Sequence, residues 1–94
     1  MGKSASLSAI KKIILENLET LQMSLVSCVE EGMLDTDDAF YNEVLDLIAD
    51  VHVVKGLDEL SEAIIKARVL EAGIAAFLAR KGKTTLSLDW PIPD

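Results

Sequence analysis

Apolar residues recur at intervals of three and four along most of the chain, which is the period of a helix with one buried face. Gly32, Gly56 and Gly82 each follow a stretch with this period. A glycine just past a helix end closes the last turn in the left-handed conformation. The pattern therefore predicts three helices, and their expected bounds are residues 4–31, 36–54 and 57–81.

Each predicted helix carries an apolar stripe that faces one shared core. The expected core residues are Leu7, Ile14, Leu18, Leu21, Leu25 and Cys28 on the first helix, Phe40, Val44, Leu47, Val51 and Val54 on the second, and Leu57, Leu60, Ile64, Ala67, Leu70, Ile74 and Phe77 or Leu78 on the third. Connections of a few residues favour antiparallel neighbours. The predicted fold class is all-α, a three-helix up-down-up bundle that forms a single domain over residues 1–94.

The helix starts are marked by capping residues. Ser4, Ser6 or Ser8 is expected to cap the first helix, and Asp35 or Thr36 the second, because their side-chain oxygens accept hydrogen bonds from free N–H groups in the first turn.

The period changes after Gly82, where apolar and polar residues alternate in "KTTLSLDWPIPD". Alternation is the period of an extended segment, and the two prolines exclude helix. The apolar side of this segment consists of Leu86, Leu88, Trp90 and Ile92. The sequence predicts an extended C-terminal tail over residues 84–94 that docks on helix side chains, with a solvated terminus as the alternative.

Half of the 94 residues are apolar, which is more than one small core can hide. We therefore expect the chain to be at least a homodimer, joined into a larger helical bundle. The candidate interface residues are Ile13, Leu15 and Val26 beside the first stripe, Val69, Gly73, Ala76 and Ala79 on the third helix, and Leu86, Leu88, Trp90 and Ile92 in the tail. The alternative for the third helix is an exposed surface rich in alanine, which needs no partner.

One charge interrupts the apolar stretch "VLEAGIAAFLA" at residues 69–79. Glu71 falls within the stripe of the third helix, where an unpaired carboxylate is costly. Asn17 is expected to lie level with it on the parallel first helix, and Arg68 lies one turn away on its own helix. We predict a structural hydrogen bond from Asn17 or Arg68 to Glu71.

The charge and composition of the chain exclude several classes of function. Nine basic against 16 acidic side chains exclude a nucleic-acid binder, because such a protein needs cations to displace counterions from phosphate. No apolar run approaches the ~20 residues that span a membrane, and "MGKSAS" fits the myristoylation pattern without the basic second signal that stable anchoring requires. A single cysteine without a secretory signal predicts the cytoplasm.

No set of reactive residues converges in the predicted fold. His52 is the only histidine, and Cys28 lies on the apolar seam, where a thiol usually serves packing. Catalytic residues, a bound metal and a cofactor are therefore not expected.

One motif of four acidic residues argues against the expectation that the chain binds no metal. Glu16 and Glu19, then 23 residues, then Glu43 and Asp46 resemble the ExxE and ExxD signature of the MazG-like nucleotide pyrophosphohydrolases, which are all-α oligomers. The resemblance implies that the four carboxylates bind Mg²⁺, which neutralises a nucleoside triphosphate and activates water. In the predicted hairpin, however, the two pairs lie about 9 Å apart along the helices. A second protomer would have to supply the missing pair.

The sequence thus favours a non-catalytic helical protein–protein interaction module, of the adaptor, chaperone or regulator type, which acts as a homo-oligomer and takes itself or another protein as its partner. The alternative is a Mg²⁺-dependent MazG-like nucleoside triphosphate pyrophosphohydrolase.

Overall fold

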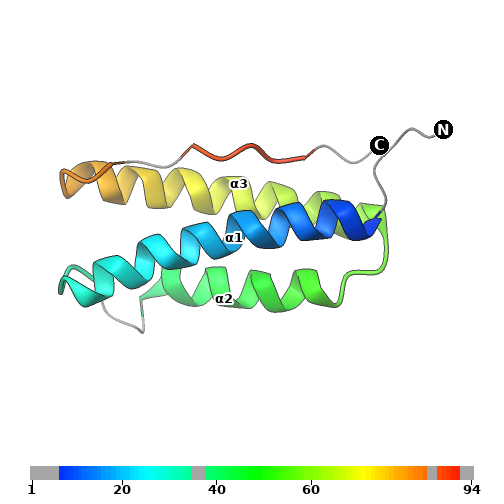
Figure 1. The fold of residues 1–94 in the computed structure, drawn as a ribbon, viewed down its shortest axis with the longest axis horizontal. Coiled ribbons are helices and arrows are strands. Elements are labelled where there is room, and N and C mark those ends of the chain that lie inside the picture. Colours follow the sequence, from blue (N-terminus) through cyan, green and yellow to red (C-terminus); the bar gives the residue numbers. More distant parts are fainter. Residues whose placement is uncertain (1–6, 35–37, 85–86, 92–94) are drawn as a thin grey trace.

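The computed structural model describes residues 7–34, 38–84 and 87–91, and within these ranges all regular secondary structure is helical. The helices are α1 (Leu7–Glu30), α2 (Ala39–His52) and α3 (Leu57–Arg80), and each packs against the other two. Figure 1 shows α1 and α3 running in the same direction, with α2 antiparallel to both. The predicted all-α bundle of three helices is confirmed.

The bundle is held together by the apolar stripes that the spacing predicted. The buried residues are Ile10, Ile14, Leu18, Leu21, Leu25, Cys28, Leu34, Val44, Leu47, Val51, Val54, Leu60, Ala63, Ile64, Ala67, Leu70, Ile74 and Leu78, and no polar or charged residue of the described chain is buried with them. Leu57 was expected in the core but is 39% exposed, because it begins α3 and has no preceding turn to cover it.

α1 and α3 end in the same way, with a glycine in the left-handed conformation. Gly32 has φ 78° and Gly82 has φ 72°. The N–H of Met33 donates to the carbonyl of Cys28, and that of Lys83 donates to the carbonyl of Leu78, both at 2.9 Å. This is the Schellman arrangement, in which the turn after the helix satisfies carbonyls of its last turn. The predicted role of these two glycines is confirmed.

Gly56 has a different role from the one predicted. Its φ of −136° and ψ of 158° are extended, and it occupies the N-cap position of α3. α2 ends earlier, at the C-cap Val53, whose N–H donates to the carbonyls of Asp50 and Val51. The sequence reading was wrong because Val54 and Lys55 separate the end of α2 from this glycine.

The predicted cap of α2 was also misplaced. Asp38 is the N-cap, and its carboxylate accepts the N–H of Phe40 at 2.8 Å, so the helix starts after the predicted residue 36. Asp35 and Thr36 lie outside the described residues, as do Ser4 and Ser6. Ser8 lies inside α1 and is therefore not its cap.

The C-terminal end of α2 is bound by a side chain from α1. The ammonium of Lys11 donates to the carbonyl of His52 at 3.1 Å and to that of Val54 at 3.0 Å. These carbonyls lie at and just beyond the last turn of α2, where the helix dipole favours a cation. Lys11 thus fixes the position of α2 along α1.

Replacing glycine with serine should have opposite effects on stability at Gly56 and at Gly32, because the two backbone conformations differ. Gly56→Ser should raise the free energy of unfolding by about 0.5 kcal/mol, because serine accepts the extended backbone, supplies the missing N-cap oxygen and restricts the unfolded chain. Gly32→Ser should lower it by roughly 1 kcal/mol, because φ there is positive. Urea denaturation of both variants measures the difference, and a stability loss at Gly56 would contradict the assigned cap.

Candidate interaction surfaces

Glu71 binds residues that follow α3 rather than the partners predicted for it. The carboxylate is half-buried on α3, and its Oε2 accepts the backbone N–H of Leu88 at 2.6 Å. Its Oε1 accepts the indole N–H of Trp90 at 3.0 Å. Both oxygens therefore serve residues 17 and 19 positions further along the chain.

Asn17 binds the same segment from α1. Its side-chain amide donates to the backbone carbonyl of Asp89 at 2.7 Å. Leu88 and Trp90, on either side of Asp89, are half-buried against the core. Residues 88–90 are thus bound by one polar side chain from α1 and one from α3, and we call this binding region the α1/α3 site.

The predicted contact between Glu71 and Asn17 or Arg68 is wrong. Asn17 and Glu71 do lie at a common level, since they bind adjacent residues, but the segment of residues 88–90 satisfies both of them. Arg68 is exposed and makes no hydrogen bond to Glu71. The prediction failed because it considered only partners on helices.

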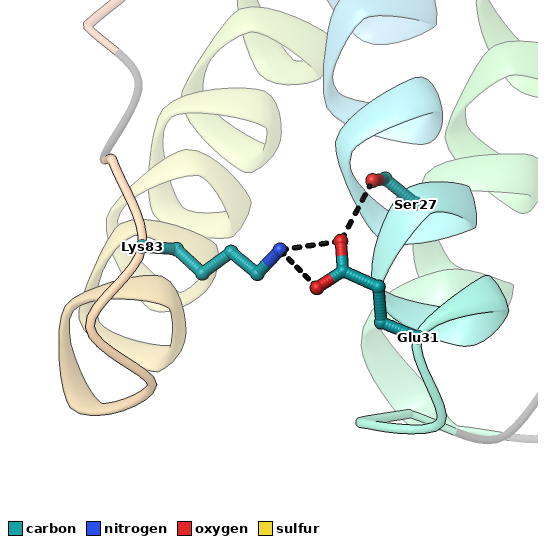
Figure 2. Close-up of polar contacts among 3 residues, drawn as sticks. All are labelled: Ser27, Glu31 and Lys83. Atoms are coloured by element: carbon teal, nitrogen blue, oxygen red, sulfur yellow. Dashed lines mark hydrogen bonds and ion pairs between the residues drawn. The ribbon is translucent and has the colours of Figure 1, made fainter.

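An ion pair joins the ends of α1 and α3. The ammonium of Lys83 donates to both carboxylate oxygens of Glu31, as Figure 2 shows, and the hydroxyl of Ser27 donates to the same carboxylate at 3.3 Å. The hydrogen bond from Lys83, together with its charge and the bond from Ser27, lowers the pKa of Glu31. Lys83 directly follows the left-handed Gly82, so the pair holds the chain where it turns back toward α1.

Three of the residues predicted for the interface lie exposed on the outer side of α3. Val69 is 68% exposed, and Ala76 and Ala79 are also exposed. They belong to a longer exposed row with spacings of four and three, which we call the α3 strip. The α3 strip consists of Ile65, Val69, Ala72, Ala76 and Ala79. Ile65, 63% exposed, was not predicted, although its spacing of four from Val69 signals it.

Gly73 does not belong to this exposed surface. A Cβ atom at this position would lie 2.8 Å from Cε1 of Phe40, which is closer than side-chain carbons pack. The small residue therefore permits close packing of α2 on α3 within one chain. Gly73, which was predicted at the interface, therefore faces Phe40 of its own chain.

The other predicted interface residues are dispersed. Ile13 is 40% exposed on α1, whereas Leu15 and Val26 are half-buried and Leu15 packs against the core. Met23, which was not predicted, is 71% exposed. Leu86 and Ile92 lie outside the described residues.

The four acids of the MazG-like motif lie in two different open grooves. A groove of about 390 Å³ between α2 and α3 contains Glu43 and Asp46, whereas a groove of about 380 Å³ along α1 contains Glu16 and Glu19. Among the described residues, no three His, Cys, Asp or Glu side chains are grouped so that they could hold a metal ion. One chain therefore does not assemble the four-acid site.

No protein-family model matches the sequence, and no curated protein or solved structure is significantly similar to it. None of the described helices is both long enough and apolar enough to cross a membrane.

The ion pair predicts a pH-dependent contribution to stability. Because the pKa of Glu31 is lower in the folded chain, the pair stabilises the fold above the carboxyl's unfolded pKa, and this contribution is lost as the pH falls through the folded pKa. Lys83→Ala should therefore reduce stability at neutral pH and cost progressively less in acid. Thermal unfolding between pH 7 and pH 3 measures this, with Lys12→Ala as the control for losing one exposed lysine. A difference that is independent of pH would contradict the pairing.

Proposed function

We propose that the protein is a non-catalytic helical interaction module that associates with a second copy of itself through the α3 strip. The observation that carries this proposal is the exposure of two β-branched apolar side chains one turn apart, Ile65 at 63% and Val69 at 68%. Single exposed apolar residues are common on protein surfaces, but a continuous row along a helix is typical of an interface.

The spacing of the α3 strip suits a helix partner. Intervals of four and three residues keep the row on one side of a helix over several turns, as in the seam between two packed helices. The alanines Ala72, Ala76 and Ala79 let a second backbone approach closely, while Ile65 and Val69 supply most of the apolar area. A second copy of α3 offers the same combination.

Charges at the ends of the α3 strip favour an antiparallel pair. Glu62 precedes the strip and Arg80 follows it, and both side chains are exposed. They are 18 residues apart, which is five full turns, so both lie on the same line along α3. In an antiparallel pair each glutamate faces the partner's arginine, whereas a parallel pair sets like charges against each other.

The proposal also includes the C-terminal tail and the cellular location of the protein. Residues 84–94 would form an extended tail on the opposite side of α3, which leaves the α3 strip open to a partner. The chain's cysteine, Cys28, is a buried free thiol, which suits a reducing cytoplasm.

Replacing Val69 should separate the two copies. Val69→Glu places a carboxylate in an apolar contact at a cost of several kcal/mol, so the variant should have a mass near 10.2 kDa, whereas the unmodified chain should have about twice that mass. Light scattering at micromolar concentration measures both. Met23→Glu is the matched control, because Met23 is 71% exposed on α1 and the variant should remain a dimer.

A charge exchange tests the antiparallel orientation within the same experiment. Glu62→Arg should weaken the dimer, and adding Arg80→Glu should restore it. A monomeric unmodified chain would refute the proposal. Hydrolysis of nucleoside triphosphates with Mg²⁺ would instead support the MazG-like alternative, with its four acids contributed by two protomers.

A further inference from the structure

The α1/α3 site has the features of a peptide-binding site. Glu71 accepts one backbone N–H and one indole N–H, and Asn17 donates to the intervening backbone carbonyl. The site thus binds one backbone donor, one backbone acceptor and one aromatic donor within three consecutive residues. Leu88 and Trp90 add apolar contacts with the core.

We propose that the α1/α3 site also binds residues 88–90 of a second copy, so that two chains exchange their C-terminal segments. Each exchanged segment would make the same three hydrogen bonds with the partner's Asn17 and Glu71 that it makes within one chain. Such an exchange leaves the helices in place and moves only the chain that follows α3.

The balance between the two arrangements depends on concentration. Because the contacts are identical, the intramolecular form is favoured only by the covalent connection, which gives the segment a high effective concentration. The connection is reinforced by Lys83, which binds Glu31 at the end of the chain's own α1. The segment itself is held by three hydrogen bonds and two half-buried side chains, so a second copy can compete for the site.

This contact is independent of the α3 strip. Glu71 and Val69 are two residues apart on one helix, so their side chains point about 160° apart. Exchange at Glu71 and pairing at Val69 therefore occur on different sides of α3. The two proposals can fail separately. Pairing is measured by the loss of mass in Val69→Glu at micromolar concentration, where each segment stays on its own chain, and exchange is measured by the environment of Trp90 at higher concentration.

Two complementary variants of the full chain test the exchange. Glu71→Ala damages the site and keeps the segment, whereas Trp90→Ala keeps the site and removes the chain's only tryptophan. Alone, the first variant should emit as an indole in water. Titration with the second variant should shift this emission to shorter wavelength and saturate, because the tryptophan then enters the intact site of the other chain.

The control titrant carries both substitutions and should cause no shift. A titrant with Trp90→Ala and Asn17→Asp should bind about fivefold or more weakly, because it loses one hydrogen bond and sets a carboxylate against the carbonyl of residue 89. If Glu71→Ala does not fold, as judged by circular dichroism, Asn17→Asp replaces it as the fluorescent variant.

Two results would overturn the proposal. The first is an emission maximum that stays unchanged up to millimolar titrant. The second is an equal shift with the double variant, which would place the tryptophan somewhere other than the α1/α3 site.

Discussion

The carboxylate of Glu71 lies within the apolar stripe of α3 and needs hydrogen-bond donors there. The position of the segment after α3 meets this need. Glu71 lies on the same helix as the buried residues Leu70 and Ile74, where a charged group without hydrogen-bond donors would be costly. Its two oxygens receive donors from Leu88 and Trp90. The segment after α3 therefore completes the polar requirements of the bundle, and no buried side-chain nitrogen or oxygen of the described residues lacks a hydrogen-bond partner.

Residues 69–79 carry few charges because apolar neighbours contact this part of α3 on more than one side. Leu70, Ile74 and Leu78 face the core, and Gly73 receives the ring of Phe40 from α2. These contacts, together with those of Glu71, cover most of the helix with its own chain. The remaining side carries the α3 strip, which is the basis of the proposed self-association.

The helices and their buried faces could be predicted from sequence because both follow from local rules. An apolar period of three to four residues identifies the face, and the left-handed Gly32 and Gly82 mark the ends. Gly56 was assigned to the wrong helix end because glycine serves both an N-cap and a C-terminal turn, and the sequence does not show which conformation the residue adopts.

The candidate surfaces were harder to predict because they depend on distant contacts. Glu71 was correctly expected to need a partner, but Leu88 and Trp90 approach it only after the chain reverses beyond Gly82. Gly73 was taken as an interface residue because a small side chain permits close approach in general, whereas its actual neighbour is Phe40. The two pairs of acids show the converse: they satisfy a spacing pattern while lining separate grooves.

Hydrogen exchange at the two donors bound by Glu71 tests this contact most directly. The backbone N–H of Leu88 and the indole N–H of Trp90 should exchange with deuterated solvent more slowly than in an unstructured peptide, and Glu71→Ala should remove the protection of both together while the amides of the helix cores stay protected. Exchange of both groups at the unstructured rate in the unmodified chain would show that Glu71 does not bind the segment.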